Sequence, residues 1–347
     1  MTLPTRPLRL DGSGRTDRAM ASLIGVVALY RRLSGMSGRR RPPVATVARD
    51  LPLVVDEVRR EADGVAGLRL VHERGAPLPR WRPGAHIDLS PRPGLVRQYS
   101  LCGDPADRSA YRVGVRSLGE GSAAVHALEK GARVTARGPR NAFPFVASPA
   151  YLFVAGGIGI TPILPMVRQA AAAGADWRLV YTGRDEASMP FLEELSRIEA
   201  LFPAERSSAL SGDRVWIRPD TTYGIPASGA ELLEGAPEGA PIYCCGPAPM
   251  IVGVRTDAAL RASGPVFFER FSPPPIVGGE PFRVALARSG RVLDVPADRT
   301  TLDLLRETVP GIAYSCRQGF CGTCEVPTVT GDRVRICVER EPVSLDL

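Results

Sequence analysis

The sequence predicts a multidomain α+β and α/β chain: an antiparallel β-barrel, a doubly wound parallel-sheet domain of the kind that binds NAD, and a C-terminal ferredoxin-like domain. Three observations predict it. At 347 residues the chain is too long for one ordinary core. Short alternating apolar runs fill the first part and give way to alternating strands and helices. Four of the seven cysteines crowd into residues 316–337.

Composition indicates a globular protein, with 44% hydrophobic and 23% charged residues. No window reaches the roughly 18 apolar residues that a membrane span needs. The nearest, residues 19–30, is short and flanked by arginine, and no small-residue cleavage site follows it. We therefore expect a cytoplasmic protein without a membrane span.

The net charge is +7, but no base-reading motif accompanies it and the arginines look scattered. A basic, soluble surface is the simplest interpretation, and it excludes nucleic acid as a partner. Part of this surface is expected to dock an acidic protein partner, with the chain itself a monomer.

Five segments follow one another along the chain. Residues 1–48 form a basic extension with one helix over 20–33. The apolar face of this helix could pack on the main body, contact a partner or lie near a membrane surface, and packing is favoured. The barrel occupies 49–147, the NAD domain 148–271, a proline-rich linker 272–280, and the ferredoxin-like domain 281–347.

The expected elements follow the apolar patterns. Barrel strands include 53–58, 67–71, 86–89 and 111–115. In the NAD domain, strands 151–155, 178–181 and 241–244 alternate with helices 163–173 and 189–199. In the last domain, strands 282–286 and 291–295 form a hairpin around Ser289-Gly290, and a helix covers 302–308.

Cys316, Cys321 and Cys324 have the C-x4-C-x2-C spacing that holds a plant-type [2Fe–2S] cluster. Gly319 and Gly322 let the backbone wrap a compact anionic group and point N–H groups at sulfur. Zinc is the alternative, but it usually needs paired C-x2-C knuckles, and only one occurs here.

Cys337 is the predicted fourth ligand, on an expected strand over 335–339. It follows Cys324 by 13 positions, whereas the gap in plant-type proteins is usually roughly thirty residues. Cys102, Cys244 and Cys245 fall in other predicted domains, so Cys337 is preferred.

Four further motifs accompany the cysteine loop in a fixed order. They are Arg97-Gln-Tyr-Ser-Leu-Cys-Gly-Asp104, Gly156-Gly-Ile-Gly-Ile-Thr-Pro162, Tyr243-Cys-Cys-Gly-Pro247 and Phe268-Glu-Arg-Phe271. With these motifs, residues 50–347 resemble the ferredoxin–NADP reductase superfamily and, more narrowly, the phthalate dioxygenase reductase and vanillate demethylase reductase family.

The resemblance implies a flavin-binding β-barrel, with FMN rather than FAD, and a C-terminal β-grasp ferredoxin domain. Arg97 would pair with the flavin phosphate, Tyr99 would lie against the ring, and Ser100 would hydrogen-bond near N5. Gly121 and Ser122 would open a helix that receives the phosphate, unless they are only an ordinary helix cap. Val115 and Arg116 would lie beside the flavin.

Gly156, Gly157, Gly159 and Thr161 lie between a buried strand and a helix, where a glycine turn lets a pyrophosphate approach the helix. The pattern departs from a strict G-x-G-x-x-G and matches the reductase variant that ends in Thr161-Pro162.

Arg184 would meet the adenine end, and Ser188 the ribose or pyrophosphate. The neighbouring Asp185 and Glu186 disfavour a 2′-phosphate and so favour NADH over NADPH, although a solvated charged loop explains them equally well.

Cys245, Gly246 and Pro247 follow a strand end, where open α/β sheets place their chemistry. The resemblance places Cys245 beside the nicotinamide; a buried structural cysteine is the alternative. Glu269 and Phe271 would lie near the flavin ring. Of all these residues, Ser100 and Cys245 are the predicted catalytic ones.

The implied function is electron transfer from NADH through FMN and the cluster to a separate terminal oxygenase, a Rieske protein or a cytochrome P450. NADH gives electrons in pairs and the cluster takes one, so a flavin between them explains the three modules. Two alternatives stay open: a flavin reductase with a degenerate cluster, and a non-catalytic redox sensor.

Overall fold

The computed structural model describes most of the chain and divides it into two compact units. The described residues are 17–38, 50–202, 214–261, 263–271, 276–309, 311–314, 317, 319 and 322–347. The units are Met1–Arg49 and Asp50–Leu347. Across the described residues we find no helix whose length and apolar character suffice to cross a membrane.

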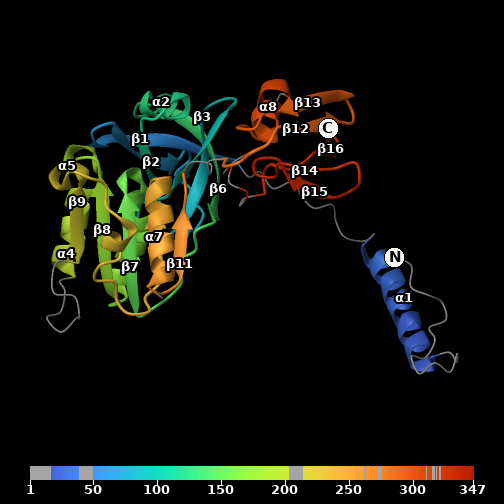
Figure 1. Ribbon diagram of the computed structural model, residues 1–347, viewed down its shortest axis with the longest axis horizontal. Helices are drawn as coiled ribbons and strands as arrows, with labels where there is room; N and C mark the ends of the chain where they lie inside the picture. Colours follow the sequence, from blue (N-terminus) through green and yellow to red (C-terminus); the bar gives the residue numbers. More distant parts are fainter. Residues whose placement is uncertain are drawn as a thin grey trace. The chain divides into compact units, whose positions relative to one another are not determined.

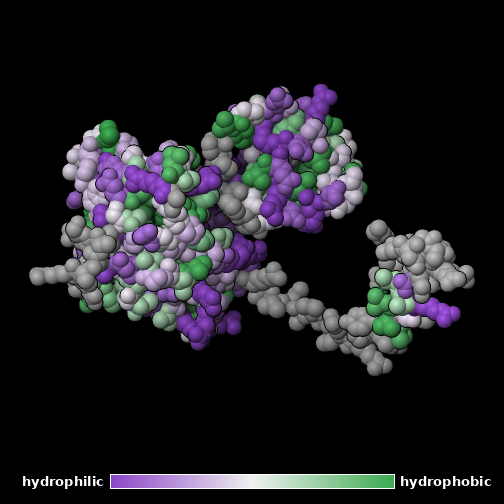
Figure 2. All heavy atoms as spheres, turned by 60° about the horizontal axis from the view of Figure 1, so that its bottom comes forward, coloured by the Kyte–Doolittle hydropathy of each residue, from purple (hydrophilic) through white to green (hydrophobic). Residues whose placement is uncertain are grey.

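The first unit contains a single described helix, α1 (Arg18–Gly38), which is longer at both ends than predicted. At its start the Asp17 carboxylate accepts a hydrogen bond of 3.0 Å from the Met20 N–H, a typical N-terminal cap. Hydrophobic side chains lie on the described surface of this helix (Figure 2).

The second unit begins with a six-stranded antiparallel barrel (Figure 1). Its strands are β1 (Asp50–Ala62), β2 (Val65–His72), β3 (Ala85–Arg92), β4 (Leu95–Ser100), β5 (Ala110–Arg116) and β6 (Arg133–Asn141), in the order β4-β3-β6-β1-β2-β5. A bridge between Leu101 and Val113 joins the two ends of the sheet. The short helix α2 (Glu120–His126) contributes Val125 to the barrel core.

A parallel five-stranded sheet follows, with the order β11-β10-β7-β8-β9. Its strands are β7 (Ala150–Gly156), β8 (Asp176–Gly183), β9 (Val215–Pro219), β10 (Ile242–Cys245) and β11 (Val266–Glu269). The helices are η1 (Gly157–Gly159), α3 (Ile160–Ala172), η2 (Glu186–Ser188), α4 (Leu192–Leu201), α5 (Asp220–Tyr223), α6 (Gly229–Leu232) and α7 (Ala248–Leu260).

Side chains of β7 alternate between two cores, which confirms a sheet covered on both faces. Tyr151 and Phe153 pack in the cluster that contains α3, whereas Leu152 and Val154 pack in the cluster that contains α7. Figure 1 shows α7 next to β11, and α7 contacts both β10 and β11.

The helix predicted over 189–199 begins three residues later than expected, at Leu192. Phe191 just before it has a left-handed backbone (φ 67°), which a continuous helix does not permit.

The last part of the chain is a small α+β domain. A three-stranded sheet has the order β13-β12-β16, from β12 (Phe282–Leu286), β13 (Arg291–Val295) and β16 (Val343–Leu345). Helix α8 (Thr301–Thr308) starts at a capping box between Thr300 and Asp303. A separate hairpin joins β14 (Glu325–Pro327) to β15 (Arg333–Arg335).

The strand predicted over 335–339 was wrong. β15 ends at Arg335, and Cys337 lies in the turn after it. Ile336 and Cys337 are consecutive and both are buried, a pattern that a strand with two different faces does not produce.

Candidate functional site

Three strand ends from two domains meet at one place. Barrel strand β4 ends at Ser100, and the parallel strands β10 and β11 end at Cys245 and Glu269. The Ser100 hydroxyl donates a 3.4 Å hydrogen bond to Glu269 Oε2, and Cys245 is the register partner of Glu269. The barrel therefore presents Ser100 to the edge of the parallel sheet where ligands of open α/β folds bind.

The surroundings keep both the acid and the thiol of this site protonated near neutral pH. Burial raises the pKa of Glu269 to about 8, and the hydrogen bond from Ser100 opposes that rise. Burial, together with the charges of Glu269 and Cys244, raises the pKa of Cys245 well above its usual value. Cys245 is therefore a neutral packing group and not a thiolate nucleophile.

Arg97 lies directly over Gly121, at the start of α2. A Cβ added at Gly121 would lie 2.5 Å from Arg97 Nε, so a side chain there would displace the guanidinium. The Ser122 hydroxyl is already engaged, since it accepts hydrogen bonds from the N–H groups of Leu118 (2.8 Å) and Gly119 (3.0 Å). Arg97 and Gly121 are thus brought together as predicted for a phosphate, whereas Ser122 caps its own loop.

The residues between Arg97 and Ser100 leave one buried polar atom open. Gln98 Nε2 is buried and has no hydrogen-bond partner among the described residues. Tyr99 packs against the barrel core, and burial raises its pKa to about 12. Gln98 and Tyr99 are consecutive in β4 and therefore face opposite sides of the strand, so only Tyr99 shares a face with Arg97. A neutral phenol on the Arg97 side suits a heteroaromatic ring and fits a flavin.

Val115 and Arg116 have different environments although they are adjacent. The Val115 side chain belongs to the barrel core, and its carbonyl lies 2.8 Å from His126 Nε2. Arg116 instead reaches into the NAD domain, where Nη2 donates a 2.5 Å hydrogen bond to the Ser188 carbonyl. The two predicted residues Arg116 and Ser188 therefore contact each other.

The glycine turn packs too closely against the β10 turn to admit side chains. A Cβ at Gly159 would lie 2.2 Å from the Cys245 carbonyl oxygen, and one at Gly156 would lie 2.6 Å from Pro247 Cδ. A Cβ added at Gly246 would likewise lie 3.0 Å from the Gly156 Cα. The predicted nucleotide residues are therefore held together by backbone contact, which leaves bare backbone for a pyrophosphate.

Two further glycine-turn residues are positioned by hydrogen bonds. Gly157 has a left-handed backbone (φ 54°), and its carbonyl accepts a 3.1 Å hydrogen bond from the Tyr181 hydroxyl. The Thr161 hydroxyl donates to the Ile158 carbonyl at 2.9 Å. Thr161 thus fixes the turn and does not project into it.

The charged residues after β8 mainly organise their own loop. The Asp185 carboxylate accepts a 2.8 Å hydrogen bond from the Ser188 N–H and caps η2, while Arg184 and Glu186 are exposed. Phe271, after β11, is 45% exposed.

Two of the four predicted cluster cysteines are in the described part of the chain, and they are neighbours. Cys324 Sγ lies 3.0 Å from Cys337 Sγ, and both side chains are buried. Two sulfurs on one tetrahedral metal ion with bonds of ~2.3 Å would be about 3.7 Å apart, so the pair is close enough to share an iron once the sulfurs separate slightly. Cys316 and Cys321 lie outside the described residues.

The short connection between Cys324 and Cys337 folds as the β14–β15 hairpin. Its strands pair directly after Cys324, and the Ile336 N–H donates to the Cys324 carbonyl at 3.4 Å. Arg335 donates a 2.8 Å hydrogen bond to the Gly319 carbonyl and so ties the hairpin to the cysteine loop. A short hairpin is therefore sufficient to bring the two cysteines together.

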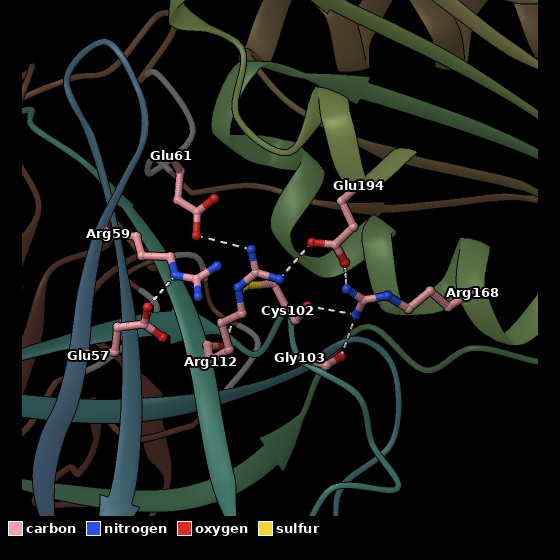
Figure 3. A network of polar contacts seen from close by, with 8 residues as sticks. All are labelled: Glu57, Arg59, Glu61, Cys102, Gly103, Arg112, Arg168 and Glu194. Carbon is pink, nitrogen blue, oxygen red and sulfur yellow. Dashed lines mark hydrogen bonds and ion pairs between the residues drawn. The ribbon is translucent and has the colours of Figure 1, made fainter. Parts of the chain in front are cut away.

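A charged network at the junction of the barrel and the NAD domain was not predicted (Figure 3). Arg112 of β5 donates to Glu61 (3.0 Å) and to Glu194 of α4 (2.6 Å). Arg168 of α3 pairs with the same Glu194 and donates to the carbonyls of Cys102 (2.9 Å) and Gly103 (2.8 Å). No local spacing signals this network, because its members are far apart in the sequence.

Other contacts of the same junction reach the loop after β8. The Asp63 N–H in the β1–β2 turn donates a 2.7 Å hydrogen bond to the Ala187 carbonyl. The Arg112 guanidinium stacks over the Phe191 ring at 4.7 Å, and Phe191 in turn packs against Gly114. The loop that carries Arg184 and Ser188 is thus fixed to the flavin barrel.

A pocket of about 320 Å³ opens beside this network and contains none of the predicted cofactor residues. Its arginines Arg59, Arg69, Arg112 and Arg168 are each already paired with a carboxylate. We therefore assign the network a structural role.

Replacing Arg112 by methionine is expected to lower the free energy of unfolding by about 2 kcal/mol, because Glu61 and Glu194 lose a part-buried partner. Arg59→Met removes an exposed pair with Glu57 within the barrel and should cost no more than about 0.5 kcal/mol. Urea denaturation measures both. Equal costs for the two variants would show that the junction contributes nothing to stability.

Two family models match the chain. A 2Fe-2S iron-sulfur cluster binding domain matches residues 284–343, and an oxidoreductase NAD-binding domain matches residues 153–256. They cover the cysteine loop and the glycine turn.

Named relatives share most of the chain. It is 36% identical over 293 residues, 82% of this chain and 88% of the relative, to a putative toluene-4-sulfonate monooxygenase system reductase subunit of Comamonas testosteroni. The crystal structure of phthalate dioxygenase reductase, described as transferring electrons from pyridine nucleotides to [2Fe–2S], matches with a TM-score of 0.65 and 30% identity over 86% of this chain and 98% of that one.

An intact type IV self-sufficient cytochrome P450 monooxygenase also matches, with a TM-score of 0.65 and 31% identity. The match covers 89% of this chain and 43% of that chain, so this chain spans less than half of that protein.

Proposed function

Because this chain belongs to the phthalate dioxygenase reductase family, we propose that it carries electrons from NADH through FMN and a [2Fe–2S] cluster to a separate terminal oxygenase. Members of this family named above are reductase components of oxygenase systems. The chain is accordingly an NAD-dependent oxidoreductase with a ferredoxin domain.

The meeting of Ser100, Cys245 and Glu269 is the observation that carries this proposal. A hydride passes only between atoms in contact, so flavin and nicotinamide sites on different domains must share one place. The 3.4 Å hydrogen bond from Ser100 to Glu269 joins the two domains at that place.

When bound, FMN accepts electrons in pairs and gives them up singly, and the cluster carries one at a time. The residues of this chain position these groups. Arg97 holds the flavin phosphate, Tyr99 faces the ring, and Ser100 hydrogen-bonds beside N5.

On the nucleotide side, the bare backbone at Gly156, Gly157 and Gly159 takes the pyrophosphate, and Arg116 and Ser188 close the junction. The neutral Cys245 thiol and the neutral Glu269 carboxyl line the nicotinamide pocket without adding charge to it.

Cys316, Cys321, Cys324 and Cys337 hold the cluster. Arg97 Nη1 also lies 3.4 Å from the hydroxyl of Tyr314, two residues before Cys316. This contact supports a short path from the flavin site to the cysteine loop.

The terminal oxygenase is a Rieske protein or a cytochrome P450, and the reductase acts as a monomer in the cytoplasm. The first alternative, a flavin reductase with a degenerate cluster, is disfavoured because Cys324 and Cys337 remain 3.0 Å apart despite their short connection. The second, a non-catalytic sensor, does not explain why a hydride site is assembled between two domains.

Anaerobic titration with NADH tests this function. The purified protein is expected to show flavin bands over a broad iron–sulfur envelope, and both should bleach after about 1.5 equivalents of NADH, since the flavin takes two electrons and the cluster one. Bleaching of a flavin alone with about one equivalent would establish the flavin reductase, and no bleaching would establish the sensor.

A further inference from the structure

The positive charge of this protein is concentrated in its first 49 residues. These contain ten arginines, two aspartates and no lysine or glutamate, a net charge of +8. The whole chain carries +7, so residues 50–347 together carry −1. The electron-transfer unit is therefore nearly neutral, and the extension is strongly basic.

This extension is an addition to the fold of phthalate dioxygenase reductase. The match to phthalate dioxygenase reductase covers 98% of that protein but 86% of this one. Residues 50–347 alone make up 86% of the 347 residues, so the shared fold needs none of the first 49.

The one described helix of the extension exposes large apolar side chains. Leu23, Val26 and Leu29 are 56%, 63% and 58% exposed, and Met20 is 47% exposed. Figure 2 shows this hydrophobic surface on α1. Several large apolar side chains on consecutive turns form a patch that soluble proteins usually cover.

Along this helix and the residues that follow it, apolar and charged residues occupy separate stretches of the sequence. Residues 19–30 contain no charged side chain and span about 18 Å as a helix, far less than the ~30 Å thickness of a bilayer core. Arg18 precedes them, and Arg31, Arg32 and residues 39–41, all arginine, follow. From Arg18 to Arg49 there is no acidic residue.

We propose that α1 docks on an anionic lipid surface and lies in the plane of the interface. The apolar side chains of α1 would enter the boundary between headgroups and acyl chains, and the arginines would pair with lipid phosphates. An apolar segment alone or a polybasic segment alone binds a membrane weakly. The two together give stable attachment.

The chemistry of the patch distinguishes lipid from an acidic protein. An acidic protein surface matches the arginines but leaves the apolar residues of α1 without partners, whereas a lipid interface accommodates both in one arrangement. Since residues 50–347 are nearly neutral, the extension alone would recruit the reductase, independently of the acceptor it serves.

Co-sedimentation of the full-length protein with vesicles tests the proposal. We expect at least about tenfold stronger binding to phosphatidylcholine vesicles that contain phosphatidylglycerol than to phosphatidylcholine alone, decreasing with added salt. The double variant Leu23→Asp/Val27→Asp should lose this binding. Val292→Asp, at a similarly exposed apolar residue of β13, is the matched control and should bind like the wild type.

NADH-dependent ferricyanide reduction should be the same in all these proteins and shows that each one is folded. Several results would overturn the proposal: no binding to either vesicle, equal binding to both, or binding that survives the double variant. Light scattering that shows self-association dependent on Leu23 and Val27, without vesicle binding, would instead assign α1 to a second copy of the chain.

Discussion

Replacing Cys337 by serine is expected to abolish one-electron transfer while NADH still reduces the flavin. Cys337 is the only cysteine in the described residues that lies beside Cys324, at 3.0 Å between sulfurs. A serine hydroxyl is a much poorer iron ligand than a thiolate, so the iron content should fall well below about two atoms per chain and cytochrome c reduction should fall by about 100-fold or more.

Cys244→Ser is the matched control for this experiment. Cys244 is equally buried, but it lies in the core between β10 and α7. Its variant should keep its iron and its cytochrome c activity. Stopped-flow measurement of flavin reduction separates loss of the cluster from loss of the fold. Full iron content in Cys337→Ser would show that the fourth ligand lies elsewhere.

Elements whose signals are local could be predicted from the sequence with accurate bounds. The hairpin over 282–286 and 291–295 has the predicted ends, because alternating side chains and the Ser289-Gly290 turn are contained within it. Helix α8 begins one residue before the prediction, where Thr300 and Asp303 cap it.

Elements that depend on distant partners could not be predicted as well. The late start of α4 follows from the left-handed Phe191, which is held between Arg112 and Gly114 of the barrel. Nothing near Phe191 in the sequence indicates that arrangement. The expected strand over 335–339 failed for a related reason, since Ile336 is drawn into the core of the last domain and its carbonyl accepts a hydrogen bond from Leu302.

The residues of the candidate site also differ in how local their sequence signals are. Short motifs predicted Arg97, Ser100, Cys245 and the glycine turn, because these candidate cofactor residues are grouped in the sequence. The junction residues Arg112 and Glu194 are 82 positions apart and resemble any other surface charge. The basic character of residues 1–48 was predicted, but the size of the charge difference between them and residues 50–347 was not, because one net charge for the whole chain conceals it.

Replacing Glu269 by glutamine is expected to remove a pH dependence from hydride transfer. The pKa of Glu269 is raised to about 8, so the carboxyl is mostly neutral at pH 7 and ionises above pH 8. Its ionised form places a negative charge beside Ser100, where electrons arrive. Flavin reduction by NADH should therefore slow by about tenfold between pH 7 and pH 9 in the wild type. The glutamine variant should show a flat profile.

Glu129→Gln, at an exposed residue of the barrel, is the matched control and should keep the wild-type profile. A profile that persists in Glu269→Gln would assign the titration to another group.

The raised pKa of Glu269 lowers the stability of the protein as pH rises, whereas a salt-bridged acid raises it. Between about pH 4.5 and pH 8 the unfolded chain loses the Glu269 proton while the folded protein keeps it. The unfolded state then binds fewer protons, so the free energy of unfolding decreases as pH rises through this window. Glu269→Gln has no proton to lose and should lack that decrease. Urea denaturation at pH 6 and pH 8 should therefore show a smaller loss of stability in the variant than in the wild type, because the cost of keeping a buried carboxyl neutral is absent.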